Sequence, residues 1–308
     1  MHLRYGSHKI SVDGSRFPEI AALPLPALGP NAIEPLPLGK ANYHRKGSFD
    51  IWQDALFQFG IAHMQIDDSA LADSARELYD ELFSLTRGSY LYRIWNYIPN
   101  LNSGIGDEER YRQFSLGRSC SFRQEFGEED TSRMPAGTCV GIQGERMAVC
   151  FLSGVSSPDH YENPNQIPAY RYPRQYGPKS PSFARATSVS VLPHHYRFIS
   201  GTAAVMGHES MGVGDLEKQL QITCDNIEKI AHQTIELSDF DGEDQTLYAC
   251  KVYLRHAADY PVARRLLQLR FPQIEERFVY LQSDICRKEL MVEIELSYRD
   301  SVRQHHLL

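Results

Sequence analysis

The sequence predicts an α+β protein of two lobes. Its 308 residues correspond to about two domains of roughly 150 residues each. Ser, Asn and Pro residues interrupt any regular element between residues 155 and 165, which places the division there. Helical and strand-like patterns follow one another on both sides of this division. We therefore expect an N-terminal lobe at residues 1–160 and a C-terminal lobe at residues 161–308.

The composition is typical of a globular protein, with 42% apolar and 23% charged residues. The formal net charge of −7 removes the usual electrostatic basis for binding nucleic acid. The chain contains no run of about 20 apolar residues, the length that a membrane-spanning helix needs. The segment Met1 to Gly6 lacks a signal-peptide pattern. We therefore expect a cytoplasmic protein that binds neither nucleic acid nor membrane.

Neither the cysteines nor the histidines form a recognisable metal motif. The cysteines include no C-x-x-C pair, and the histidines include no H-E-x-x-H. A chain of this length without a secretion signal is expected to keep its cysteines as free thiols. We expect neither a metal ion nor a cofactor.

The N-terminal half begins with a proline-rich segment at residues 18–37, which excludes a continuous helix or a central strand. A helix follows, which Asp67 or Asp68 caps and Gly88 ends. Residues 89–99 are rich in Tyr, Ile and Trp and predict a strand. Apolar residues at spacings of four, three and four predict the helix: Leu71, Ala75, Leu78 and Leu82.

The C-terminal half contains clearer patterns. Apolar and Thr positions at alternating spacings of four and three predict a helix at residues 216–234, with Asp215 as its cap. Residues 260–270 predict a second helix, with Pro261 in its first turn. Strands are expected at residues 247–254, 277–281 and 290–296.

The last of these strands carries two acidic residues. Glu293 and Glu295 are two positions apart, so a strand places them on the same face. The apolar residues Leu290, Val292, Ile294 and Leu296 alternate with them and occupy the opposite face.

Residues 163–208 contain no Asp or Glu, so charge is segregated along the chain. Within this span, residues 169–186 (AYRYPRQYGPKSPSFARA) combine arginines and tyrosines with three prolines. The prolines predict a rigid, irregular loop. Guanidinium groups on such a loop suit a small carboxylate-bearing ligand. A solvated basic surface loop and a site for single-stranded nucleic acid are the alternatives.

Several long stretches of the chain, in consistent order, carry a more specific signal. They are RIWNYIPNLN (93–102), ERYRQFSLGR (109–118), ENPNQIPAYRYPRQYGPKSPSFARA (162–186), SGTAAVMGHES (200–210) with Gly214 and Asp215, KVYLRHAADYP (251–261) and YLQSDICRKELMVEIE (280–295). Together they resemble the chorismatases, enzymes that split pyruvate from chorismate. The resemblance implies a fold of two lobes, of which the C-terminal one is similar to the YjgF/RidA chorismate-mutase-like fold. It implies chorismate as substrate and a cofactor-free lyase reaction that yields pyruvate and 3-hydroxybenzoate, with 4-hydroxybenzoate as a minor product.

The resemblance also implies which residues bind the substrate. Arg185 and Tyr172 would hold its ring carboxylate, and Arg118 would hold its enolpyruvyl carboxylate. Arg174, in the same loop as Arg185, is a further candidate for substrate binding.

For catalysis the resemblance points to Glu293, which would protonate the enolpyruvyl methylene group. To remain protonated near neutral pH, this carboxyl must be buried. Glu295 shares its face and is the rival candidate. Cys286 and Gly201 are characteristic of the branch that forms 3-hydroxybenzoate, with Ala203 as an alternative to Gly201 at the diagnostic position.

Other functions are compatible with the sequence. A chorismatase of the hydrolytic branch would release a dihydroxycyclohexadiene carboxylate instead of an aromatic acid. A RidA-like module that binds a small molecule without turning it over is a third reading. We favour a monomer, since two fused lobes can satisfy internally the contacts that small RidA-like proteins make in trimers.

Overall fold

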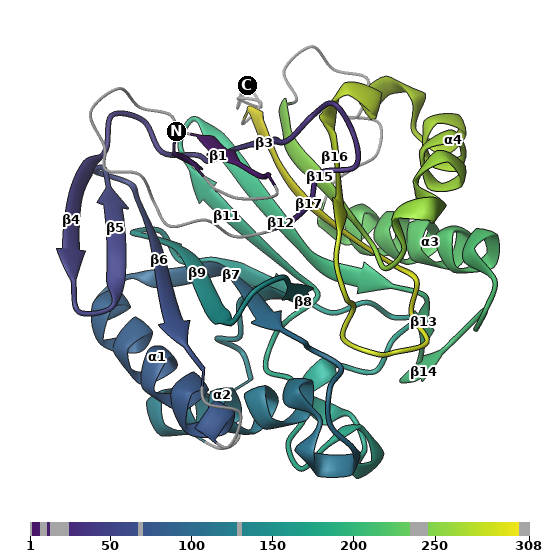
Figure 1. The fold of residues 1–308 in the computed structure, drawn as a ribbon. Coiled ribbons are helices and arrows are strands. Elements are labelled where there is room, and N and C mark those ends of the chain that lie inside the picture. The colour runs from purple at the N-terminus through teal and green to yellow at the C-terminus, as the bar shows by residue number, and fades with distance from the viewer. Residues whose placement is uncertain are drawn as a thin grey trace.

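The computed structural model describes residues 2–6, 11–12, 25–66, 70–127, 131–234 and 246–301. Two six-stranded sheets lie at the centre, and helices cover the outer face of each (Figure 1). The layers therefore run helix, sheet, sheet, helix. This arrangement confirms the predicted α+β class with two lobes.

The N-terminal sheet is antiparallel except for its last two strands, β7 and β8, which are parallel. Helices α1 (Leu71–Thr86) and α2 (Arg110–Phe126) pack on its outer face. The strand order is β4 (Asn42–Lys46), β5 (Phe49–Gln53), β6 (Phe57–Gln65), β9 (Arg146–Gly154), β7 (Tyr90–Pro99) and β8 (Ala136–Ile142).

The C-terminal sheet is also antiparallel except for its last two strands, β15 and β16. Helices α3 (Leu216–Thr234) and α4 (Tyr260–Arg270) pack on its outer face. The strand order is β10 (Asp159–Tyr161), β11 (Ala186–Val191), β12 (His194–Ala203), β17 (Val292–Ser301), β15 (Thr246–Leu254) and β16 (Phe278–Gln282). A separate hairpin is formed by β13 (Val205–Met206) and β14 (Glu209–Ser210).

The two sheets share one topology. Apart from the β13–β14 hairpin and the separate sheet of β1 (His2–Arg4), β2 (Ser11–Val12) and β3 (Ile33–Pro35), each lobe has three strands, a helix, a strand, a second helix and two more strands in chain order. In each, the final strand is inserted between the third and the fourth. The lobes are therefore topological copies of one unit, although we find no repeat of residue identities in the sequence.

The predicted boundary at residue 160 falls inside β10, which already belongs to the C-terminal sheet. The described part of the proline-rich segment also departs from the predicted division, because it packs against β16. The backbone N–H of Leu28 donates to the carbonyl of Tyr280 at 2.9 Å, and Ala27 bridges to Leu281. Within this segment, β3 pairs with β1, which also pairs with β2. The exact limits of the lobes remain a prediction.

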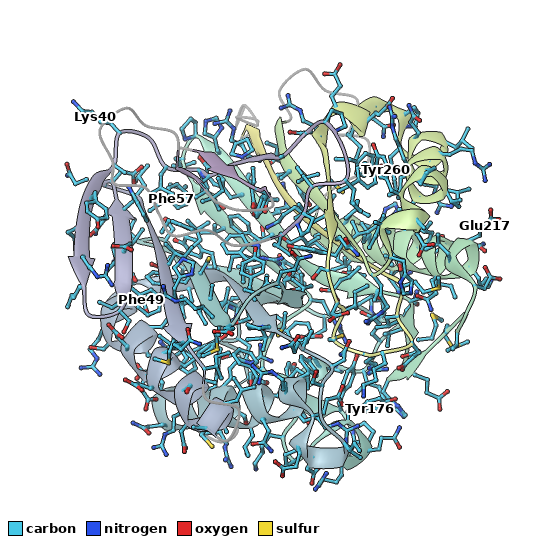
Figure 2. The ribbon with its side chains drawn as sticks, in the orientation of Figure 1. Lys40, Phe49, Phe57, Tyr176, Glu217 and Tyr260 are labelled. Atoms are coloured by element: carbon cyan, nitrogen blue, oxygen red, sulfur yellow. The ribbon has the colours of Figure 1, made fainter. Side chains whose placement is uncertain are left out.

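The inner faces of the two sheets share an aromatic core. Phe57 of the N-terminal sheet, labelled in Figure 2, packs edge-on against Tyr196 of the other sheet, with 5.0 Å between ring centroids. Tyr92 and Phe198 are stacked nearly parallel across the same interface, at 6.5 Å. The interface between the lobes is thus packed with large rings rather than bridged by a linker alone.

Most of the predicted elements have close counterparts in the structure. The predicted helices correspond to α1, α3 and α4, and the predicted strands to β7, β15, β16 and β17. Asp215 caps α3, since its Oδ1 accepts the backbone N–H of Lys218 at 3.0 Å. Asp67 and Asp68, the expected caps of α1, lie outside the described residues.

Candidate active site

A cavity of about 540 Å³ is lined by residues of both lobes. One wall comes from α2 and the turn before it, a second from the loop at residues 172–185, and a third from β12, β17 and the loop before β17. Tyr176, at the lower edge of the molecule in Figure 2, lines this cavity. The volume suits a small organic ligand. A second cavity of about 30 Å³ shares five lining residues with the first: Tyr111, Phe183, Gly201, Cys286 and Glu293.

Glu293 is a buried carboxyl that lines both cavities, and only 4% of the residue is exposed. Because Val292 and Ile294 pack towards the helices, β17 directs Glu293 to the inner face of the sheet. Burial, and then the neighbouring charge of Glu295, raise its pKa to about 8, although Arg93 and Arg185 act in the opposite direction. Glu293 is therefore protonated at neutral pH.

Small residues on the neighbouring strand, β12, make room for the Glu293 carboxyl. Ala203 pairs with Glu293 across the two strands, and both Ala203 and Gly201 line the larger cavity. A β-carbon added to Gly201 would overlap Oε1 of Glu293. Position 201 therefore requires glycine for as long as Glu293 holds this orientation.

Arg185 and Tyr172 lie together on another wall of the larger cavity. Arg185 is buried, and its Nη2 donates to the Tyr172 hydroxyl at 2.7 Å and to the Ile167 carbonyl at 3.2 Å. Its Nε has no hydrogen-bond partner among the described residues, and Glu162 Oε2 is 3.9 Å away. Burial raises the pKa of Glu162 to about 7 against the opposing effect of Arg185. The charge of Arg185 is thus only partly compensated by protein groups.

Arg118 lies on α2, at the wall of the smaller cavity, and is only 2% exposed. Its Nε and Nη2 have no hydrogen-bond partner within the described part of the chain. The guanidinium lies 5.2 Å from the ring centroid of Phe114. A buried guanidinium with unpaired donors is unfavourable unless a ligand supplies the acceptors. The smaller cavity is therefore a candidate anion site.

Cys286 and Glu295 have different relations to the cavities. Cys286 lines both cavities, and burial, then Glu293, raise the pKa of its thiol to about 12, so the thiol stays neutral. Glu295 lines neither of them. Burial alone would raise the pKa of Glu295, but Lys251 and Arg93 lower it to about 2. Glu295 is therefore ionised, and of the two glutamates only Glu293 holds a proton near neutral pH.

The structure does not bring Arg174 into this group. Its guanidinium forms a two-point contact with the carboxylate of Asp107, at 2.9 and 2.5 Å, and its side chain is 65% exposed. It lines a separate hollow of about 360 Å³ together with Lys179. A basic residue in a loop of this kind is indistinguishable from its neighbours by sequence, because only the loop's path decides which guanidinium turns inward.

Sequence reasoning missed Arg287, which also lines the larger cavity. Its guanidinium lies 4.0 Å from the ring centroid of Tyr176 and 5.2 Å from that of Tyr172. It also donates to the carbonyl of His208 and to the hydroxyl of Ser210. Arg287 directly follows Cys286 within one of the family-like stretches, so its position was a signal that could have been used.

Among the described residues, no group of three or more His, Cys, Asp and Glu side chains is arranged to hold a metal ion. Within the same residues, none of the helices has the length and apolar character needed to cross a membrane.

Comparison with known proteins yields consistent matches. Residues 38–153 match the family model described as chorismatase FkbO/Hyg5-like, N-terminal. A 3-hydroxybenzoate synthase of Streptomyces hygroscopicus is 37% identical over 238 residues, which cover 72% of this chain and 68% of that relative. A chorismatase of the same organism is 32% identical over 256 residues, covering 78% of this chain and 71% of that relative.

Solved structures extend these matches to the fold. A chorismatase crystal structure matches with a TM-score of 0.71 and 30% sequence identity, covering 83% of this chain and 78% of that one. The YjgF protein of E. coli matches 47% of this chain with 16% identity, at a TM-score of 0.30 that is too low to support a conclusion. On the strength of its sequence relatives, this chain belongs to the chorismatase family and is an enzyme of that type.

Proposed function

We propose that this protein cleaves the enolpyruvyl ether of chorismate and releases pyruvate and 3-hydroxybenzoate. The observation that carries the proposal is a buried, protonated carboxyl, Glu293, that faces a small cavity beside two incompletely paired guanidinium groups. Chorismate carries two carboxylates and an acid-labile enol ether, so it needs both features. The names and identities of the relatives support the same substrate.

The two arginines suit the two carboxylates of such a substrate. Arg185, whose Nη2 donates to the Tyr172 hydroxyl, would bind the ring carboxylate. Arg118, with two free donors at the smaller cavity, would bind the enolpyruvyl carboxylate. Hydrogen bonds between a buried guanidinium and a carboxylate are stronger than neutral ones, so these contacts would fix the orientation of the substrate.

Glu293 would then start the reaction as a general acid. Transfer of its proton to the enolpyruvyl methylene converts the enol ether into an oxocarbenium ion, and the carbon–oxygen bond to the ring breaks as pyruvate leaves. The raised pKa of Glu293 supports this role, because the acid form is the populated one at neutral pH. Glu293 is left as a carboxylate that can take up the proton lost by the ring.

The surroundings of Glu293 favour an aromatic product. If water adds to the cation, the ring leaves as a dihydroxycyclohexadiene carboxylate. If water is excluded, the oxygen of the ring hydroxyl bonds to the adjacent ring carbon as pyruvate leaves from it with the ether oxygen, and loss of the hydroxyl hydrogen gives an epoxide. Cleavage of the epoxide bond to the carbon that first carried the hydroxyl, with protonation of the oxygen and loss of the hydrogen on the other epoxide carbon, gives 3-hydroxybenzoate, so that the two products together have the composition of the substrate. The neutral thiol of Cys286 and the close packing at Gly201 support exclusion of water.

The test is to incubate the purified protein with chorismate, measure pyruvate with a coupled lactate dehydrogenase assay, and resolve the ring products by chromatography. We expect equal amounts of pyruvate and 3-hydroxybenzoate. Glu293→Gln, which keeps the shape of the side chain, should lower kcat by at least about 100-fold. Glu275→Gln, at an exposed ion pair with Arg264, is the matched control and should retain activity.

Two other results of this experiment would each overturn part of the proposal. A dihydroxycyclohexadiene carboxylate as the main ring product would overturn the assigned product and identify the hydrolytic reaction. Binding of chorismate without release of pyruvate, equal in wild type and Glu293→Gln, would overturn catalysis and identify a binding protein.

A further inference from the structure

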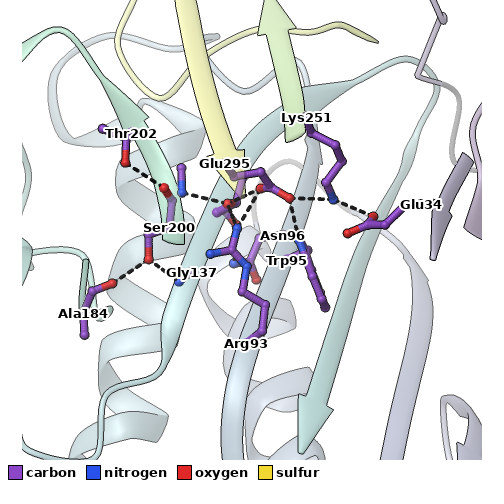
Figure 3. A network of polar contacts seen from close by, with 12 residues as sticks. Glu34, Arg93, Trp95, Asn96, Gly137, Ala184, Ser200, Thr202, Lys251 and Glu295 are labelled. Atoms are coloured by element: carbon purple, nitrogen blue, oxygen red, sulfur yellow. Dashed lines mark hydrogen bonds and ion pairs between the residues drawn. The ribbon is translucent and has the colours of Figure 1, made fainter. Parts of the chain in front are cut away.

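Glu295 is two residues further along β17 than Glu293 and belongs to a buried network of charged groups, which Figure 3 shows. Lys251 Nζ is 2.6 Å from its Oε1, and Arg93 Nη2 is 2.8 Å from its Oε2. Trp95 Nε1 donates to Oε1 at 2.8 Å, and the hydroxyl of Thr138 donates to Oε2. Four donors from three other strands therefore fix this carboxylate in place and in its ionised form.

A second carboxylate completes the network. Glu34 Oε2 is 2.8 Å from Lys251 Nζ, and both side chains are 1% exposed. The network thus contains two cations, Lys251 and Arg93, and two anions, Glu295 and Glu34. It is balanced without any charge on Glu293. A third carboxylate charge at position 293 would be uncompensated within the network, in an environment where burial makes that costly.

Thr138 connects this network to Glu293. Its Oγ1 accepts the backbone N–H of Gly201 at 3.0 Å and Nη2 of Arg93 at 2.5 Å, while its hydrogen is given to Glu295. The hydroxyl lies beside the space that Glu293 fills, since the position of a Gly201 β-carbon is 3.1 Å from it. Because Glu295 takes its only hydrogen, Thr138 has none to donate to an ionised Glu293.

The other groups that face Glu293 divide into cations and neutral acids. The cations are Arg185, Arg118 on α2 and Arg93 on β7, of which Arg93 is already paired with Glu295. In the proposed complex, the substrate carboxylates would occupy Arg185 and Arg118. The neutral groups are Tyr111 on α2, Cys139 on β8 and Cys286, whose pKa values are all raised, by burial first. Glu109 and Glu289 also line the larger cavity, but Glu295 is the carboxylate whose charge raises the pKa of Glu293.

We propose that Glu295, clamped by Lys251 and Arg93, is the positioning residue that keeps the proton on Glu293. It acts through its fixed negative charge and by holding the hydrogen of Thr138, and it touches no substrate. Glu34 contributes from the N-terminal segment by balancing Lys251, which would otherwise weaken the field of Glu295. This inference rests on the role of Glu293 proposed above.

The pH dependence of kcat/KM tests the inference. A general acid must be protonated in the free enzyme, so wild-type kcat/KM should fall as pH rises through about 8, the pKa of Glu293. In Glu295→Gln the negative charge is lost while both cations remain, so Glu293 should ionise more easily. We expect this basic limb to move to lower pH by at least about one unit, which leaves kcat/KM at pH 6 almost unchanged but lowers it about threefold or more at pH 7.5 and about tenfold at pH 9.

Two further variants complete the test: Glu34→Gln as a second probe of the network and Asp300→Asn as a control. Glu34→Gln leaves all bonds of Glu295 intact and should shift the limb in the same direction by a smaller amount, which also serves if Glu295→Gln fails to fold. Asp300 lies further along β17 and forms an ion pair with Arg197. Asp300→Asn removes this ion pair and should leave the basic limb of the pH profile unchanged.

The possible failures are distinguishable. If wild type releases no pyruvate from chorismate, the proposed function is wrong. If wild type is active and Glu293→Gln is not, the proposed role of Glu293 stands. If a folded Glu295→Gln or Glu34→Gln then has a lower kcat/KM at every pH but keeps the wild-type basic limb, Glu295 has a structural role and the inference is overturned.

Discussion

Glu293 and Glu295 are chemically identical side chains on one face of one strand, and their surroundings give them opposite protonation states. The sequence predicts that they share a face, because a strand has a period of two. It does not predict which of them holds a proton. That depends on Lys251, Arg93 and Glu34, which lie far from β17 in the chain and reach it only through the packing of the two sheets. Sequence reasoning needed the family resemblance to choose Glu293, whereas the structure gives a physical reason for the choice.

At the same scale, Gly201→Ala should impair catalysis much more than folding. The new methyl group would overlap Oε1 of Glu293 and force the carboxyl to turn away. A displacement of about 1 Å at a reacting group costs on the order of 100-fold in rate, so kcat should fall by about that factor. Steady-state kinetics on pyruvate release would measure it, with the far-UV circular dichroism spectrum as a check on folding.

Gly39→Ala is the matched control for this substitution. Its added β-carbon would come no closer than 3.7 Å to a neighbour, Oδ2 of Asp54, which is ordinary contact. Gly39 lies outside both cavities and should tolerate the change. Full activity of Gly201→Ala would contradict the orientation of Glu293 described above.

At the scale of elements, local pattern predicts the helices that have an apolar stripe and fails for the one that does not. Apolar spacing and a cap predict α1 and α3, and a helix-permissive stretch with Pro261 in its first turn predicts α4, but α2 was not expected. The buried face of α2 includes Gly117, Ser115 and Ser121. A β-carbon at Gly117 would overlap the backbone carbonyl of Ala72 on α1, so small residues are needed where the two helices touch. Close packing therefore removed the apolar period that sequence reasoning uses.

The cap of α3 gives a prediction at this scale. Asp215→Ala removes the acceptor for the Lys218 backbone N–H and leaves that donor without its partner. We expect a loss of about 1 kcal/mol in the free energy of unfolding, measured by urea denaturation. Asp215→Asn keeps an acceptor oxygen and should lose much less. Equal stability of Asp215→Ala and wild type would show that solvent replaces the cap at no cost.

At the scale of the whole molecule, two topologically equivalent lobes enclose a site to which they contribute different residues. The N-terminal lobe supplies Arg118 and Thr138, and the C-terminal lobe supplies Glu293 and Gly201. Neither lobe alone contains both Glu293 and Arg118. The relative position of the lobes therefore determines the geometry of the site, and the groups that fix this position matter for function as well as for stability.

Lys251 is such a group, because it joins three parts of the chain. From β15 it contacts Glu295 of the same sheet and Glu34 of the N-terminal segment, and its ammonium lies 5.0 Å from the ring centroid of Trp95 in the other sheet. Lys251→Met should leave two buried carboxylates with less compensation. Removing one partner of a buried ion pair typically costs about 3–5 kcal/mol, and we expect a loss of that size in the free energy of unfolding.

Denaturant unfolding followed by tryptophan fluorescence would measure this loss, since Trp95 lies within the network. Arg264→Met is the matched control: it removes an ion pair with Glu275 in which both side chains are at least one third exposed, so stability should change by less than about 1 kcal/mol. If Lys251→Met were as stable as this control, the network would not hold the two sheets together. The shared aromatic core, with Phe57 against Tyr196 and Tyr92 against Phe198, would then be sufficient to fix the lobes.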